Sequence, residues 1–281
     1  MGKFDGIVIL TDLDGTFLSS TSGVVERNIR AIEYFKSEGG RFSLATGRMH
    51  YNLESLIPHV DSLTNAPAIL CNGTYLYDFA SGTIVAEQFM DADLALAAAL
   101  YVHENFTDIR LRVSRHEGYL LFEEDVYSLH ELLGYGIDTY EVKPAAEWNG
   151  SRWYKMVLSG AAERVNVLEA ALKQQFSGVF EYNRSRATSL ELQMKGTNKA
   201  SLLNELRHVL QHDGRPCRIC VCGDYENDRA ILEAADVAVC PDNALPEIKA
   251  ICRLCLCSND DGVVADLVEA LCACGHGGTL F

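Results

Sequence analysis

Apolar runs alternate with helical segments along the first 70 residues of the chain. The segment Gly6–Thr11 reads Gly-Ile-Val-Ile-Leu-Thr, a continuous apolar run typical of a parallel strand that is buried on both faces. A helix is predicted over 25–38 because Gly39-Gly40 stops its pattern, and further strands are predicted over 41–45 and 66–71. Each of these strands runs into polar residues. The pattern predicts an α/β fold with a doubly wound parallel sheet, whose ligands lie beyond the carboxyl ends of the strands.

The pattern changes in the middle of the chain and then returns. Two hairpins are predicted over 75–87 and 109–122, and helices with further strands follow up to residue 184. This material predicts an inserted α+β domain over residues 80–191. Alternating helices and strands resume with predicted helices over 197–211 and 226–234, predicted strands over 219–222 and 237–240, and a closing helix after Gly262. The first domain is therefore expected to be discontinuous, formed by residues 1–79 and 192–281.

Composition and charge narrow the possible functions. The 281 residues are 48% hydrophobic and 22% charged, as in a globular protein with a sizeable core, and the formal net charge is −15. This charge argues against nucleic acid or an anionic membrane as a partner, whereas small anionic substrates remain possible. We find neither an apolar run of about 18 residues nor a signal-peptide pattern, so we expect a cytoplasmic protein. Its ten cysteines are then expected to be free thiols.

Two carboxylates follow the first predicted strand, in the sequence Asp12-Leu13-Asp14-Gly15-Thr16. Burying either of them is costly unless a cation compensates the charge, and a set of oxygen ligands favours Mg²⁺ over zinc. A calcium loop would need an acid or amide at position 16, Gly at 17 and Glu at 23, and the sequence has none of these. Taken alone, the pair could also be two solvated turn aspartates.

A second acidic cluster, Gly223-Asp224-Tyr225-Glu226-Asn227-Asp228, follows another predicted buried strand and opens a helix. It offers Asp224 as a further oxygen ligand and Asn227 as a hydrogen-bond donor near helix N–H groups that favour an anion. Helix capping could explain Asp224 or Asp228 singly. It does not explain why polar clusters also follow the strands that end before Asp12 and Thr46.

Two further segments suit a phosphoryl group. Thr46-Gly47-Arg48 supplies a hydroxyl and closely approaching backbone N–H groups. Lys199 is predicted in the first turn of a helix, where an ammonium opposes the helix dipole, so an anion is expected between the helix start and the lysine. The chain has no Gly-x-x-x-x-Gly-Lys-Ser/Thr pattern and hence no P-loop.

These motifs together resemble the haloacid dehalogenase (HAD) superfamily, and specifically the Cof-type phosphatases of subclass IIB. The resemblance extends over nearly the whole chain, and it implies a Rossmann-like core with a C2-type cap (C2B) inserted after the third strand. The matching segments, in family order, are Asp12-Leu13-Asp14-Gly15-Thr16, Ala45-Thr46-Gly47-Arg48, Asn72-Gly73, Asn198-Lys199, Gly223-Asp224-x-x-Asn227-Asp228, Asn243-Ala244 and Asp261-Gly262-Val263.

The resemblance also implies roles for individual residues. Asp12 resembles the nucleophile that becomes an aspartyl-phosphate, and Asp14 resembles the acid/base that serves the leaving alcohol and then water. The implied Mg²⁺ ligands are Asp12, the backbone carbonyl of Asp14, and Asp224, with Asp228 supporting them. The implied phosphate-binding groups are Thr46, Gly47, Lys199, Asn227 and the N–H of Leu13. The expected activity is Mg²⁺-dependent hydrolysis of small phosphorylated metabolites, most simply sugar phosphates.

The sequence leaves three alternative functions open. A phosphomutase of the phosphomannomutase type would share this fold, and a catalytically silent relative is disfavoured by the intact acids. A Cys-ligated metal protein is suggested by Cys217-x-x-Cys220-x-Cys222 and Cys252-x-x-Cys255-x-Cys257. We favour ordinary packing for these cysteines, because both runs are predicted on buried strands. The sequence assigns neither the particular substrate nor the oligomeric state.

Overall fold

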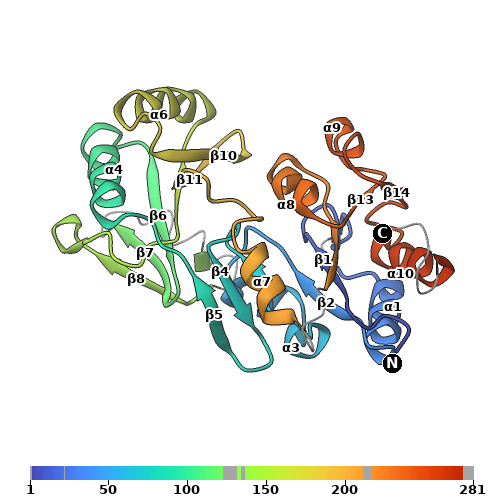
Figure 1. Ribbon diagram of the computed structural model, residues 1–281. Coiled ribbons are helices and arrows are strands. Elements are labelled where there is room, and N and C mark those ends of the chain that lie inside the picture. Colours follow the sequence, from blue (N-terminus) through green and yellow to red (C-terminus); the bar gives the residue numbers. More distant parts are fainter. Residues whose placement is uncertain (1, 22, 123–131, 134–136, 212–216, 275–281) are drawn as a thin grey trace. The chain divides into compact units, whose positions relative to one another are not determined.

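The computed structural model describes residues 2–21, 23–122, 132–133, 137–211 and 217–274. The chain divides into two compact units (Figure 1). The core unit is Met1–Glu87 with Asn198–Phe281, and the insert unit is Gln88–Thr197. The units thus divide a few residues later than the sequence-predicted boundaries at 80 and 191.

The core unit is built on a parallel five-stranded sheet of order β14-β13-β12-β1-β2. Strand β1 lies between β12 and β2, with Val8 in register with Ile219 on one side and with Arg41 on the other. The residues of β1 from Val8 to Thr11 are all buried, so both faces of the strand are covered, and this explains its continuous apolar run. The strands are β1 (Ile7–Thr11), β2 (Arg41–Leu44), β12 (Arg218–Cys222), β13 (Val237–Pro241) and β14 (Leu254–Leu256).

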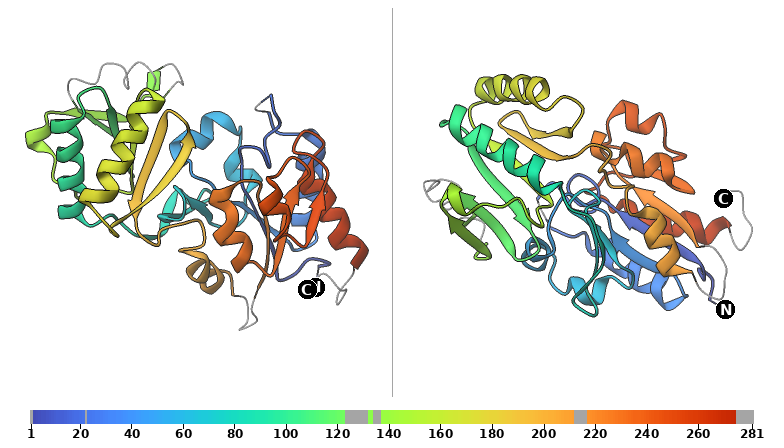
Figure 2. Two further views of the ribbon diagram at one scale, coloured as in Figure 1. Left: turned by 90° about the horizontal axis from the view of Figure 1, so that it is seen from above. Right: turned by 60° about the vertical axis from the view of Figure 1, so that its left-hand side comes forward.

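Helices pack on this sheet. On one face, Leu203 and Leu206 of α7 and Ile231 of α8 form a core cluster with Val8 and Ile219. Helices α1 and α10 pack against each other, and Figure 2 shows α10 on the side of the sheet away from α8. The helical elements of the core unit are α1 (Glu26–Ser37), α2 (His50–Leu56), α3 (Val60–Leu63), α7 (Leu203–Leu210), η2 (Glu226–Asp228), α8 (Arg229–Ala234), α9 (Pro246–Lys249) and α10 (Val263–Cys274).

The third predicted strand differs from the expectation. Strand β3 (Ala68–Leu70) pairs antiparallel with β4 (Tyr75–Asp78), and β4 pairs with β5 (Thr83–Glu87). A single parallel bridge between Ala45 and Ile69 connects β3 to the segment just beyond β2. The short turn after β3 reverses the chain at once, so β3 joins the following hairpin. The prediction is therefore confirmed only in part: β3 lies parallel to the segment after β2, with a hydrogen bond from the Thr46 N–H to the Ile69 carbonyl (2.9 Å), but it is not one of the five strands of the parallel sheet.

The insert unit is a six-stranded mixed sheet with helices packed on it. Its order is β10-β11-β9-β6-β7-β8, antiparallel throughout except for the parallel pair β7 and β8. Alternate strand residues such as Leu111, Val113 and Leu158 share a core cluster with Ala98 and Leu168 of the helices. Its elements are α4 (Ala92–Asn105), β6 (Arg110–Arg115), β7 (Gly118–Phe122), β8 (Tyr140–Lys143), η1 (Ala145–Glu147), β9 (Lys155–Ser159), α6 (Ala162–Gln175), β10 (Phe180–Arg186) and β11 (Ser189–Met194).

The architecture confirms the predicted fold class, which is an α/β core with a parallel sheet and an inserted α+β unit. Among the described helices, none is long and apolar enough to cross a membrane.

Candidate active site

The carboxyl edge of the core sheet brings together residues from distant parts of the sequence. Asp12 follows β1 directly, and its backbone N–H donates to the carbonyl of Cys222, the last residue of β12 (2.8 Å). Asp224 and Asp228 follow β12. Because β1 and β12 are adjacent and parallel, their ends lie at the same edge, and this places both acidic segments side by side.

Three carboxylates meet at this edge. Each of Asp12, Asp224 and Asp228 offers an oxygen within 4.8 Å of the other two, and they form the only such acidic, His or Cys group of three found in the described part of the chain. The ammonium of Lys199 lies 2.6 Å from Asp12 Oδ1 and 2.6 Å from Asp228 Oδ1. The Lys199 side chain is fully buried. Three carboxylates and one ammonium carry a formal charge of −2 when ionised, which a divalent cation would neutralise.

Glycine at position 15 is required by the closeness of the two acidic segments. Gly15 has a φ of +83°, and a Cβ atom there would lie 2.4 Å from Asp224 Oδ2. The neighbouring Thr16 hydroxyl donates to Asp224 Oδ1 (2.7 Å). Asp228 orients the second loop in turn, since its Oδ2 accepts from the backbone N–H groups of Asp224 (3.1 Å) and Tyr225 (3.2 Å).

The electrostatics of the cluster reflect a shortage of positive charge. Burial raises the pKa of Asp12 to about 7, against the attraction of Lys199, and burial raises the pKa of Asp224 to about 6, against the hydrogen bond from Thr16. For Lys199, burial lowers the pKa, but Asp12 and Asp228 outweigh it and hold the pKa above its usual value. The lysine therefore stays protonated while several carboxyls compete for its single charge. A hard cation fits such a set of carboxylate oxygens.

Asp14 lies in a different environment two residues away. Its carboxylate accepts two hydrogen bonds from Arg48, from Nε to Oδ2 (2.9 Å) and from Nη2 to Oδ1 (2.7 Å). The Asp14 side chain is 60% exposed and that of Arg48 is 39% exposed. The Thr46-Gly47-Arg48 motif gives Arg48 no role, and no signal in the sequence pairs it with Asp14, because the contact depends on the tertiary position of the segment after β2.

The predicted phosphate-binding residues are placed as follows. Thr46 is buried, and its Oγ1 accepts from the Arg48 N–H (3.3 Å). Gly47 lies so close to Asn72 that a Cβ atom would be 2.8 Å from its Oδ1. Leu13 is fully buried, whereas Asn227 lies on η2 with its side chain exposed.

The expectation for Lys199 requires a correction. Helix α7 begins at Leu203, and Lys199 lies in a turn before it. The helix-dipole argument for an anion at this lysine is therefore wrong. The ion pairs with Asp12 and Asp228 are the structural reason for a buried lysine here.

The cysteines also differ in part from the expectation. Cys217, Cys220 and Cys222 are buried at or within β12, as predicted. The second run is not on a buried strand, because β14 is an edge strand and Cys255 is exposed. Nine of the ten cysteines have side chains that the structure describes; all nine are free thiols, and none of them belongs to a three-ligand group among the described residues.

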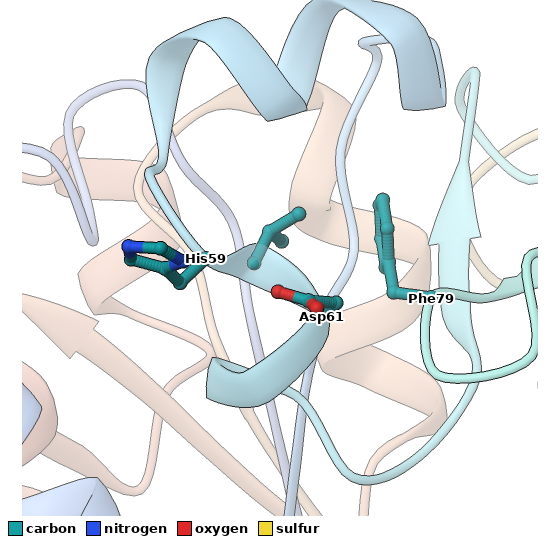
Figure 3. A pocket seen from close by; sticks show the side chains of 4 residues that line it. His59, Asp61 and Phe79 are labelled. Carbon is teal, nitrogen blue, oxygen red and sulfur yellow. The ribbon is translucent and has the colours of Figure 1, made fainter.

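A separate hollow of about 320 Å³ is lined by His59, Val60, Asp61 and Phe79 (Figure 3). None of the predicted site residues lines it. The acidic cluster of Asp12, Asp224 and Asp228 therefore lies outside this hollow.

Comparisons with known proteins agree with the fold. The family of haloacid dehalogenase-like hydrolases matches residues 9–268, and the chain belongs to this family. A Streptococcus pyogenes protein classed provisionally as a phosphatase is 26% identical over 272 residues, which are 93% of this chain and 97% of that protein. The HMP-PP phosphatase of Serratia proteamaculans is 26% identical over 244 residues, 85% of each chain.

A solved structure of a sugar phosphatase of HAD subclass IIB superposes with a TM-score of 0.76 at 16% identity, covering 94% of this chain and 98% of that one. This likeness shows the shared fold. With the family match and the phosphatase relatives, the chain is a Cof-type HAD hydrolase of the phosphatase class, a phosphoric monoester hydrolase.

Proposed function

We propose that the protein is a Mg²⁺-dependent phosphatase that hydrolyses small phosphorylated metabolites through an aspartyl-phosphate at Asp12. The observation that carries the proposal is the buried cluster of Asp12, Asp224 and Asp228 around Lys199 at the carboxyl edge of a parallel sheet. A buried carboxylate held beside a lysine is oriented for attack, and neighbouring cations disperse the charge on a transferring phosphoryl group.

The reaction divides between two aspartates. A carboxylate oxygen of Asp12 attacks phosphorus, the ester P–O bond breaks with its electron pair on the leaving oxygen, and Asp14 supplies the proton to that oxygen. Water then attacks the phosphorus of the aspartyl-phosphate and gives a proton to Asp14, which releases phosphate and restores the Asp12 carboxylate. The exposure of Asp14 suits this exchange of protons with substrate and solvent.

The proposed Mg²⁺ ligands are Asp12, the backbone carbonyl of Asp14, and Asp224. When bound, Mg²⁺ supplies the positive charge that the carboxylates lack and polarises the phosphoryl oxygens. Asp228 supports the metal site through its bonds to the backbone of the Asp224 segment and to Lys199.

The remaining phosphoryl oxygens are assigned to groups around the same edge. We assign these contacts to Thr46, Gly47, Lys199, Asn227 and the backbone N–H of Leu13. Lys199 supports this assignment because its two ion pairs fix the ammonium beside the nucleophile.

The substrate class rests on the relatives and on the insert unit. A sugar phosphatase is among the solved structures with a similar fold, and HMP-PP phosphatases are among the relatives in sequence. These relatives support a small phosphorylated metabolite as the substrate, with sugar phosphates as the first choice. We assign the choice among such esters to the insert unit, acting as a cap.

A panel of phosphorylated metabolites tests the proposal. Phosphate release is measured for each ester with Mg²⁺ present and with excess chelator. The proposal expects release that depends on Mg²⁺ for at least one sugar phosphate or related small ester. Full activity in chelator, or transfer of the phosphoryl group to a second sugar position without release to water, would contradict it.

A further inference from the structure

An asparagine outside the acidic cluster holds the loop that carries Asp12 and Asp14. Asn243 lies in the segment between β13 and α9. Its Nδ2 donates to the backbone carbonyl of Gly15 (2.7 Å), and its Oδ1 accepts from the backbone N–H of Asn259 (3.0 Å). One side chain thus connects the catalytic loop to the segment that precedes α10.

Neighbouring contacts strengthen this connection. The buried Asn259 donates through Nδ2 to the carbonyl of Leu18 (2.9 Å), at the far end of the same loop. The backbone N–H of Leu245 donates to the carbonyl of Asp224 (3.0 Å). The segment around Asn243 therefore contacts both acidic loops, the one after β1 and the one after β12.

The position of Gly15 makes its carbonyl a sensitive point of attachment. Gly15 has a positive φ and lies against Asp224, so its backbone is confined on that side. The hydrogen bond from Asn243 fixes the carbonyl of Gly15, the residue directly after Asp14. Loss of this bond frees a glycine, the residue with the greatest backbone freedom, between Asp14 and Thr16.

We propose that Asn243 is a positioning residue of the active site, which fixes the loop from Asp12 to Leu18 through the Gly15 carbonyl. The inference rests on the proposed function of this loop. Catalytic groups must be held to within a fraction of an ångström, so a loosened loop lowers turnover more than it lowers substrate binding.

A merely structural hydrogen bond is the competing explanation, and the chain contains a matched control for it. Asn65 is exposed, as Asn243 is, and it makes the same pair of hydrogen bonds. Its Nδ2 donates to the Gly40 carbonyl (3.1 Å), and its Oδ1 accepts from the Phe42 N–H (2.7 Å). These bonds hold the start of β2, away from the carboxyl edge. Asn65→Ala removes the same chemistry without touching the catalytic loop.

The test compares Asn243→Ala, Asn243→Asp and Asn65→Ala with the wild-type protein. Asn243→Asp keeps the acceptor for Asn259, replaces the donor to Gly15 with an oxygen and adds a negative charge. It also serves if the alanine variant fails to fold, and agreement of the two variants shows that the loss of the donor, and not the added charge, is the cause. The kcat and KM are measured with an aryl phosphate and Mg²⁺. Hydrogen exchange is measured on the metal-free protein for the amides of Thr16, Phe17 and Leu18, which donate to the Leu13 carbonyl.

We expect both Asn243 variants to lose about tenfold or more in kcat, with KM changed less than about threefold, and to exchange these loop amides faster. Asn65→Ala keeps the wild-type kcat and loop exchange. The inference is overturned if the Asn243 variants match the wild type in both measurements, or if Asn65→Ala shows the same losses. If the wild type hydrolyses no phosphate ester, the proposed function fails, and the exchange comparison alone still decides whether Asn243 fixes the loop.

Discussion

Asp12 and Asp14 belong to one short loop, yet they lie in opposite electrostatic environments. Asp12 is buried beside the fully buried Lys199 and two further carboxylates, and its pKa is raised to about 7. Asp14 is mostly exposed and bound by the half-exposed Arg48. The buried carboxylate is held in one place at an electrostatic cost, whereas the exposed one can exchange partners with little loss.

This difference matches the two roles that we propose. A nucleophile must be fixed against the phosphorus atom, and the cost of burying it is offset by Lys199 and by a bound cation. An acid/base group must meet both the leaving group and water, which an exposed side chain on a weak surface ion pair can do.

Replacing the buried carboxylate has the largest effect. Asp12→Asn removes the nucleophile and lowers kcat by at least about 10⁴-fold, while the fold stays nearly intact because the amide has the same size. Turnover and circular dichroism of the same preparation check both parts. Activity close to that of the wild type would remove Asp12 from the role of nucleophile.

Replacing the exposed carboxylate has an effect that depends on the substrate. Asp14→Asn lowers kcat by about 10²-fold to 10⁴-fold for alkyl phosphates, because their leaving oxygens need a proton. Phosphorylation of the enzyme by an aryl phosphate with a good leaving group is much less affected, as a burst of the aryl alcohol would show. An equal loss on both kinds of ester contradicts the division of roles.

Two lysines four residues apart give a matched pair. Lys199→Ala lowers kcat by at least about 10²-fold because a preorganised charge is removed from the phosphoryl group. Lys195→Ala changes kcat little, since Lys195 is exposed and belongs to the insert unit. Steady-state kinetics of the two variants decide the matter, and a greater loss for Lys195→Ala would show that the assignment is wrong.

Binding of Mg²⁺ should stabilise the protein in a pH-dependent way. Below their pKa values of about 7 and about 6, Asp12 and Asp224 hold protons that the cation must displace. The stabilisation therefore grows as the pH rises through this range, to about 2.7 kcal/mol when Mg²⁺ is at about 100 times its Kd. Thermal unfolding with and without Mg²⁺ at about pH 5 and about pH 8 measures it. In the Asp224→Asn variant, Mg²⁺ should stabilise the protein less. If Mg²⁺ raised the unfolding temperature of the wild type equally at both pH values, the proposed ligands would be contradicted.

The smallest effect is expected for the exposed ion pair. Arg48→Gln should change the free energy of unfolding by less than about 1 kcal/mol, because exposed pairs contribute little. Urea unfolding of Arg48→Gln measures this, with Lys199→Gln as the buried counterpart, for which a loss of about 3 kcal/mol or more is expected in metal-free protein. Similar losses of unfolding free energy in the two variants would show that burial does not distinguish the ion pairs of Lys199 from the ion pair of Arg48.

Much of this arrangement could be predicted from the sequence, because burial leaves a strong pattern there. The apolar runs of β1 and β12 locate the strand ends, and the acidic residues directly after them indicate one edge of one sheet. The start of α7 could not be predicted, since nothing in the sequence from 197 to 202 separates turns from a first helical turn. The role of β3 was equally hidden, because a short apolar run does not show which strand it pairs with.

Contacts between distant side chains were the least predictable part of the site. Arg48 with Asp14 and Asn243 with Gly15 join residues that are 34 and 228 positions apart. Each depends on where a loop folds back, which neither periodicity nor composition records. Lys199 was singled out as a cation with an unexplained position, but the acidic partners that explain its position are visible only in three dimensions.

The residue that receives the phosphoryl group can be identified directly. Asp14→Asn is mixed with an aryl phosphate and Mg²⁺, quenched rapidly in acid, digested, and its peptides are measured by mass spectrometry. We expect a phosphorylated peptide with the modification on Asp12, and none in the Asp12→Asn variant or in chelator. Release of the aryl alcohol with no phosphorylated Asp12, or with the phosphoryl group on another residue, would contradict it.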